Sequence, residues 1–112
     1  MHKIVFNRCY GGFSLSMKAV EWLENNATDE SLRAFIKSYN DIECACKEEL
    51  LRYRVSEFFE DCRHHNDLVA VVETLGTVAD GTESDLGITT ISCNQYRIDN
   101  YDGVEEVVTP YT

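Results

Sequence analysis

The sequence predicts a single α+β domain over residues 1–112, in which about four helices pack on a small mixed or antiparallel sheet in the order β-α-α-α-α-β-β-β. Three observations support this prediction. A short β-prone run near the start is followed by four segments whose apolar residues recur at helical spacing. The last third is rich in β-branched residues and turn dipeptides. A chain of 112 residues is long enough for one hydrophobic core but not for two.

The first strand and the first helix are predicted from a β-prone run and a capping serine. Residues 3–7 alternate in the manner of a short strand, and a helix is expected over residues 17–25. Ser16 is a natural N-cap for this helix. Leu15 and Val20 have the spacing of a hydrophobic staple, which sets the angle at which the chain enters the helix.

The second and third helices follow from acidic caps and from apolar periodicity. Residues 28–30 read Thr-Asp-Glu and start a helix expected over residues 29–39, because acids in a first turn complement the helix dipole. A third helix has Glu43 as its earliest possible start. Its core-facing positions recur at i, i+4, i+7, i+8 and i+11; they are Leu51, Val55, Phe58, Phe59 and Cys62.

The fourth helix carries signals at both ends. Asn66 is the predicted N-cap, and Gly76 stands where a left-handed C-terminal residue is expected. The inward face between them has helical spacing; it consists of Leu68, Val71, Val72 and Leu75.

Three further strands are expected in the C-terminal third, over residues 88–91, 95–101 and 104–109. Asp102-Gly103 between the last two predicts a two-residue type I′ hairpin, because that turn needs positive φ at both positions. We expect the N-terminal strand to pair among these three strands in one four-stranded sheet, with helices covering one face.

The charge is strongly acidic and unevenly distributed. Twenty Asp and Glu residues face ten Lys and Arg residues, so that the net charge is −10. Residues 64–112 contain only one basic residue, Arg97, against nine acidic ones. Such a surface repels phosphate backbones and disfavours direct binding of nucleic acid. It is suited to a basic protein surface, including one that normally holds nucleic acid, or it serves solubility alone.

The chain is expected to remain in the cytoplasm with its thiols reduced. Met1-His2-Lys3 leads directly into a strand, without the apolar run of a signal peptide, and no apolar stretch has the length of a membrane span. The five cysteines are an odd number, which favours free thiols over a disulfide framework.

Residues 8–13 read Arg-Cys-Tyr-Gly-Gly-Phe after a strand and precede the capping Ser16. This stretch resembles the N-terminal signature of a family of small, uncharacterised phage and prophage proteins. Residues 66–76 and residues 101–105, Tyr-Asp-Gly-Val-Glu, are similar to the same family. Leu68 departs from it, because members often have proline there, and residues 27–62 have no recognised counterpart.

The resemblance implies a phage accessory protein that acts in the host cell cytoplasm, and it supplies no catalytic residue. No cofactor is implied. An enzymatic activity is therefore less expected than a binding function.

The glycine loop before the first helix is a candidate anion or small-ligand site. Backbone N–H groups exposed ahead of a helix N-terminus can hold a phosphate. A purely structural turn is the favoured interpretation of the loop, because neither a P-loop nor a dinucleotide fingerprint is present. Cys9 could be a thiol of lowered pKa, but no base is tied to it by a motif. The residues of this candidate site are Arg8, Cys9, Tyr10, Gly11, Gly12 and Ser14.

Metal sites are not expected. Thiols and imidazoles occur together in the middle of the chain, but their spacing matches no common zinc motif; they are Cys44, Cys46, Cys62, His64 and His65. A calcium loop that places Gly103 at its sixth position would have Ile98 and Thr109 where carboxylates are required.

The sequence as a whole favours a non-enzymatic, inhibitor-like protein that binds a host or defence-system protein through an acidic surface. One alternative is a protein that binds a small ligand or nucleotide, and could hydrolyse it, with the loop from Cys9 to Ser16. Another is a homo-oligomeric accessory protein. The expected partner-binding residues are Asp99, Asp102, Glu105, Glu106 and Trp22, together with Tyr111.

Overall fold

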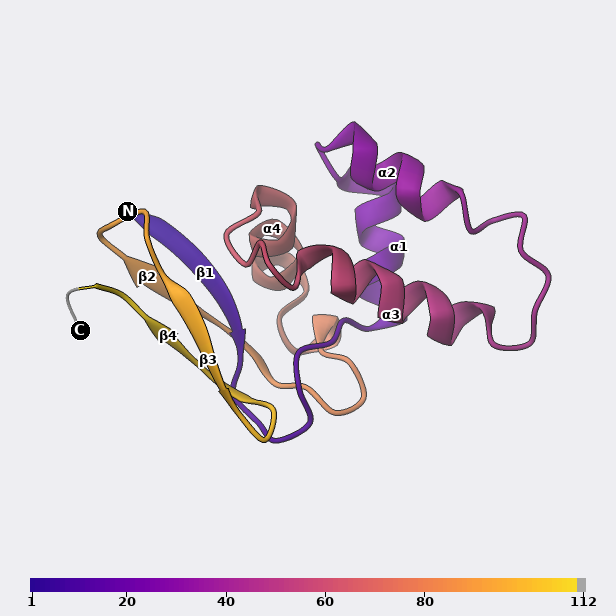
Figure 1. Cartoon of the computed structure of the whole chain (residues 1–112). Helices are drawn as coiled ribbons and strands as arrows, with labels where there is room; N and C mark the ends of the chain where they lie inside the picture. The colour runs from indigo at the N-terminus through magenta and orange to yellow at the C-terminus, as the bar shows by residue number, and fades with distance from the viewer. Residues whose placement is uncertain (111–112) are drawn as a thin grey trace.

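A computed structural model describes residues 1–110 and confirms the α+β class and the predicted order of elements. The strands lie at one end of an elongated molecule and the helices at the other, with α4 between the strands and α1 (Figure 1). The elements are β1 (His2–Asn7), α1 (Met17–Asn26), α2 (Glu30–Lys37), α3 (Lys47–Phe59), α4 (Asn66–Leu75), the 3₁₀ helix η1 (Gly76–Ala79), β2 (Leu86–Ile91), β3 (Arg97–Tyr101) and β4 (Val104–Val108). None of the helices within residues 1–110 is both long and apolar enough to cross a membrane.

The first helix begins as predicted. The Ser16 hydroxyl accepts a hydrogen bond from the Ala19 N–H at 3.1 Å, and the two staple residues Leu15 and Val20 are fully buried. Asp29 caps α2 by accepting from the backbone of Ser31 and Leu32. Local capping chemistry therefore determines both helix starts.

Two predicted helix ends were wrong by a few residues. Helix α2 stops at Lys37, because Tyr39 and Asn40 already bond to carbonyls three residues back, in the pattern of turns. Helix α3 begins at Lys47, inside the limit set by Glu43, and it ends at Phe59. Cys62 was expected on its core-facing side but lies beyond it, because the Cys62 N–H bonds to the Phe59 carbonyl three residues back, in a turn.

Helix α4 has a different cap from the one expected. Asn66 is its first residue, and the cap is His65, whose Nδ1 accepts from the Asp67 N–H at 3.0 Å. Gly76 ends the helix with φ +56° and ψ −129°; the positive φ favours glycine as predicted, but the ψ is not that of a left-handed helical cap.

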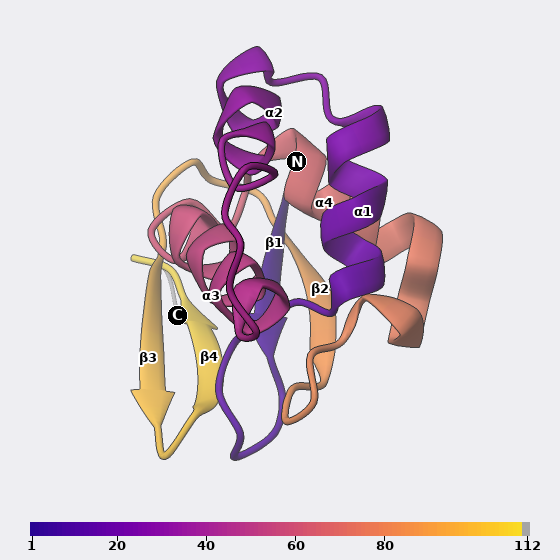
Figure 2. The ribbon, with the colours of Figure 1, turned by 90° about the vertical axis from the view of Figure 1, so that its right-hand side faces the viewer.

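The strands form two antiparallel pairs and not the single four-stranded sheet that we expected. β1 pairs with β2 from His2 opposite Ile91 to Asn7 opposite Leu86, and β3 pairs with β4. The hairpin turn is as predicted, because Asp102 and Gly103 both have positive φ, at 51° and 93°. β4 lies beside β1 without pairing with it (Figure 2).

The core lies between the β1–β2 pair and the helices, which cover one face of the strands (Figure 2). Helix α1 packs against each of the other three helices, and α4 packs against both strands of the pair. The β3–β4 hairpin adds little to this core and is attached at its side. The fully buried side chains of the core include Val5, Leu15, Leu23, Leu32, Ile36, Val55, Phe59, Leu68 and Val71.

Candidate functional site

The hairpin is attached to the rest of the molecule by a buried ion pair between Arg63 and Glu105. The two guanidinium nitrogens of Arg63 donate to the two carboxylate oxygens at 2.5 and 2.7 Å, and each side chain is 2% exposed. Phe13 packs its ring against the guanidinium, with the central carbon 3.9 Å from the ring centre. Because a buried charge is costly unless it is paired and hydrogen-bonded, this bidentate geometry is what allows both charges to be buried.

The same pair replaces backbone pairing along the free edge of β1. The Asn7 N–H donates to Glu105 Oε1 at 2.8 Å, and the Val5 N–H donates to the Arg63 carbonyl at 2.9 Å. Two N–H groups of β1 that a neighbouring strand would have used are thereby satisfied. The Glu105 side chain of β4 accepts the hydrogen bond that the backbone of a neighbouring strand would otherwise accept from β1. This explains why the strands form two sheets.

Glu105 was predicted to contact a partner, and this prediction is wrong. Alternate residues of a strand point to opposite faces, and on β4 the buried Glu105 faces inward while Glu106 faces solvent. A side chain that is enclosed in this way cannot form part of a contact surface.

The glycine loop lies against the hairpin turn and against the segment before β2. A Cβ atom on Gly11 would be 1.6 Å from the Glu83 carbonyl oxygen, and one on Gly103 would be 2.3 Å from the Tyr10 carbonyl oxygen. The Asn7 amide donates to the carbonyls of Cys9 and Gly103 at 2.6 and 2.7 Å. Close packing of backbone therefore accounts for glycine at positions 11 and 103.

The structure scatters the side chains of the predicted ligand loop. Arg8 pairs with Asp85 at 2.8 Å on the surface, and Tyr10 is 73% exposed. The Cys9 thiol donates to the Glu83 carbonyl at 3.1 Å, and the Ser14 carbonyl accepts from Ser84. These contacts are those of a structural turn, and anion binding by the loop stays a prediction.

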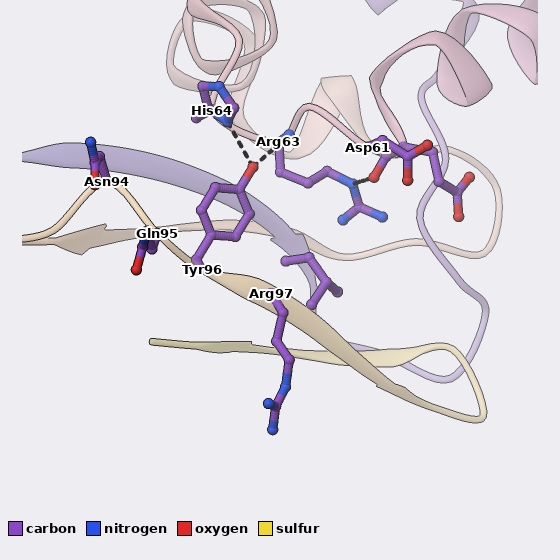
Figure 3. A pocket seen from close by; sticks show the side chains of 9 residues that line it. Asp61, Arg63, His64, Asn94, Gln95, Tyr96 and Arg97 are labelled. Carbon is purple, nitrogen blue, oxygen red and sulfur yellow. Dashed lines mark hydrogen bonds between the residues drawn. The ribbon is translucent and has the colours of Figure 1, made fainter. Parts of the chain in front are cut away.

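A cleft of about 530 Å³ opens between the end of α3 and the start of β3 (Figure 3). Tyr96 is at its centre, and the hydroxyl of this residue points toward Arg63 and His64. The Arg63 N–H donates to this hydroxyl at 3.1 Å, and His64 Nδ1 lies 2.7 Å from it. The lining consists of Glu60, Asp61, Arg63, His64, Asn94, Gln95, Tyr96, Arg97 and Ile98.

The Tyr96 hydroxyl is the central hydrogen-bonding group of the cleft. Partial burial raises the pKa of Tyr96, so its hydroxyl stays protonated at neutral pH. Sequence reasoning missed Tyr96, and an isolated tyrosine before a strand gives no signal by which to find it. Cys62 Sγ is 3.8 Å from His64 Nε2, but Cys62 does not line the cleft.

The cleft has an acidic wall. The two cations of the lining are already neutralised, Arg63 by Glu105 and Arg97 by Asp99 at 2.9 Å. Arg97 also points away from Arg63 and Asp61 (Figure 3). Glu60 and Asp61 are exposed and form no ion pair within residues 1–110.

The outer face of the hairpin continues this acidic character. Asp99 lies directly opposite Glu106, and Tyr101 lies opposite Val104. Asp99, Tyr101, Asp102 and Glu106 are all exposed, Tyr101 at 75%. Three of the predicted partner-binding residues, Asp99, Asp102 and Glu106, therefore share one end of the molecule.

Trp22 does not belong to this end. It is half-buried and packs against the core from α1, which lies away from the hairpin (Figure 1). The expected surface of Trp22 with the hairpin is therefore not formed. Tyr111 lies outside the described residues.

The residues weighed as zinc ligands are far apart. Cys44 and Cys46 precede α3, whereas Cys62 and His64 follow it, and a helix of 13 residues is about 20 Å long. Within residues 1–110 no group of three or more His, Cys, Asp or Glu side chains could hold a metal ion.

Comparison with known proteins adds no assignment: no family model, no curated protein and no solved structure matches this chain. The geometry of the cleft and the hairpin is therefore the basis for a function.

Proposed function

We propose that this chain is a non-enzymatic accessory protein that docks its hairpin and the neighbouring acidic cleft onto a basic surface of another protein. The observation that carries the proposal is Tyr101, 75% exposed on β3, with the carboxylates of Asp99, Asp102 and Glu106 around it. Exposed tyrosines are frequent anchors of protein interfaces, and a surrounding acidic rim selects a basic partner.

The hairpin is a firm platform for such a contact. Its inner face is attached through the buried pair of Arg63 and Glu105, and its turn is packed on the loop at Tyr10 and Gly12. A surface held in place loses little conformational freedom on binding, which favours affinity.

Charge supports a protein partner over a nucleic acid. Within residues 1–110, five of the ten Lys and Arg residues are paired with carboxylates. The net charge of the chain is −10. Such a field attracts a cationic surface and repels a phosphate backbone. A protein groove that normally holds nucleic acid has the required positive charge, so binding there would inhibit its owner.

The biological setting is part of the proposal. The similarity of residues 8–13, 66–76 and 101–105 to phage and prophage proteins supports a phage-encoded accessory protein that acts in the host cytoplasm on a host or defence-system protein. Free thiols on all five cysteines are consistent with a reducing compartment.

Affinity capture with a charge-matched control tests the proposal. The tagged protein is used to capture partners from host lysate, beside a hairpin variant in which Asp99, Asp102 and Glu106 are changed to lysine. The control changes three exposed acids remote from the hairpin, Glu21, Asp41 and Glu43, to lysine. Both variants have the same net charge, so only the position of the charge differs between them.

We expect the hairpin variant to lose a partner that the wild type and the control retain. With the purified partner, association should slow by about tenfold or more in the hairpin variant and at high salt, because charged rims mainly affect the on-rate. Tyr101→Ala should mainly raise the dissociation rate. Equal capture by both variants, or an association rate indifferent to salt, would refute the proposal.

A further inference from the structure

Two of the five cysteines lie in contact in the loop before α3. The Sγ atoms of Cys44 and Cys46 are 2.6 Å apart, and both residues are exposed. A turn in which the Lys47 N–H donates to the Cys44 carbonyl at 3.1 Å brings the two side chains together, and Cys46 is the N-cap residue of α3. Within residues 1–110 no other pair of cysteine sulfurs is in contact.

The two thiols are not equivalent. Cys44 Sγ accepts the Cys46 backbone N–H at 3.3 Å, and the two thiols share a hydrogen bond in which either sulfur can be the donor. These hydrogen bonds lower the pKa of Cys44, and the one between the thiols raises the pKa of Cys46. The N-terminus of α3 adds the positive end of its dipole beside them. Cys44 is therefore the thiol with the lowered pKa and the expected nucleophile of the pair.

We propose that Cys44 and Cys46 form a redox-active dithiol that exchanges with disulfides of the glutathione class. The Cys44 thiolate attacks one sulfur of the external disulfide, a Cys44–S bond forms, the external S–S bond breaks, and one thiolate leaves. Cys46 then loses its proton and attacks Cys44 Sγ, which closes the Cys44–Cys46 disulfide and expels the second thiolate. One disulfide is reduced to two thiols while the protein dithiol is oxidised by two electrons, and two protons pass to the departing thiolates.

The other three cysteines lack this arrangement. Cys9 donates to the Glu83 carbonyl, Cys93 donates to the Gln95 carbonyl, and Cys62 lies beside His64. All three are partly buried, so a disulfide in solution reaches them less easily than it reaches the exposed pair. Within the described residues they also lack a second sulfur in contact. The inference is independent of the proposed partner surface, which lies at the other end of α3 (Figure 1).

The experiment treats the intact protein with oxidised glutathione, alkylates the remaining thiols and maps the cysteines by peptide mass. We expect the peptide with Cys44 and Cys46 to resist alkylation and to be lighter by two hydrogen atoms, while Cys9, Cys62 and Cys93 are alkylated. A reducing dithiol should restore alkylation of the pair.

Single variants test the order of attack. Cys46→Ser should accumulate a glutathionyl group on Cys44, because the resolving thiol is gone. Cys44→Ser should react more slowly, at Cys46, because the sulfur that accepts the Cys46 backbone N–H is gone. Cys62→Ser is the control and should form the internal disulfide like the wild type.

The proposal is overturned if Cys44 and Cys46 of the wild type are alkylated as fully as Cys62 and Cys93 after the oxidant. It is equally overturned if glutathione attaches to single cysteines at similar rates without an internal disulfide. The wild-type measurement decides this even if a variant folds poorly.

Discussion

At the scale of the residue, the Arg63–Glu105 pair is the feature on which the placement of the hairpin depends. Each side chain is 2% exposed, and Glu105 also accepts from the Asn7 N–H. Removing one member of a buried pair leaves the other charge desolvated and without compensation, which costs far more than the pair contributes when it is complete.

Glu105→Gln should therefore lower the free energy of unfolding by about 3–5 kcal/mol, because the Arg63 guanidinium keeps its burial and loses its counter-charge. Urea unfolding of the purified protein measures the loss. Glu106→Gln is the matched control one residue along β4, and as an exposed substitution it should stay within about 0.5 kcal/mol of the wild type. Similar small losses for the two variants would contradict the role of the pair.

At the scale of the element, Asp67 joins the first turn of α4 to the junction between α1 and α2. Its carboxylate accepts from the Thr28 N–H and hydroxyl at 2.8 and 2.9 Å and from the Asp29 N–H at 2.9 Å. Burial acts to raise the pKa of Asp67, but these donors outweigh it, and the pKa lies below the ordinary value of 3.8.

A lowered native pKa gives a definite sign to the pH dependence. The unfolded chain binds a proton at Asp67 near pH 3.8, and the native chain does so only at lower pH. The contribution of Asp67 is therefore complete above that value and is lost as the pH falls through the native pKa.

Asp67→Asn should be less stable than the wild type by about 1–3 kcal/mol at neutral pH, because buried N–H groups lose a charged acceptor. The difference should shrink as the pH falls from about 4 toward 2. Unfolding by urea at a series of pH values measures it, with Asp61→Asn on the exposed turn after α3 as control. A difference that is constant across this range would contradict the assignment of the pH dependence to Asp67.

At the scale of the whole molecule, an N-terminal and a C-terminal segment of the chain meet where the glycine loop touches the hairpin turn. Gly12 and Gly103 both have positive φ, at 90° and 93°. A Cβ atom on Gly103 would collide with the Tyr10 carbonyl, whereas one on Gly12 would meet nothing within 4 Å. Substitutions at these two glycines therefore distinguish the backbone cost of positive φ from the cost of disturbing the contact between the loop and the turn.

Gly12→Ala should cost about 1–2 kcal/mol of unfolding free energy, because only the left-handed backbone opposes it. Gly103→Ala should cost about 1–3 kcal/mol more, because the loop and the turn must also move apart. Chemical unfolding of both variants compares them directly. Equal losses of unfolding free energy would mean that the contact between the glycine loop and the hairpin turn contributes nothing to stability.

Much of the fold follows from local chemistry. Three helix ends are set by residues within one turn of them, namely Ser16, Asp29 and Gly76. The hairpin turn needs two residues with positive φ, and Asp102 and Gly103 both adopt it. Neighbouring residues alone therefore predict these features. The predicted ends of α2 and α3 were less accurate, because a continuing apolar pattern does not show where hydrogen bonds change to those of a turn.

By itself the sequence determined the α+β class, the order of the elements, the hairpin and the acidic charge, because each depends on composition or on residues close together along the chain. Only the tertiary structure decided that Glu105 is buried, that the sheet divides, and that Tyr96, Arg63 and His64 line one cleft. Arg63 and Glu105 are 42 positions apart. The three-dimensional packing of loop, strand and turn decides which carboxylate of the acidic hairpin pairs with the buried Arg63 guanidinium.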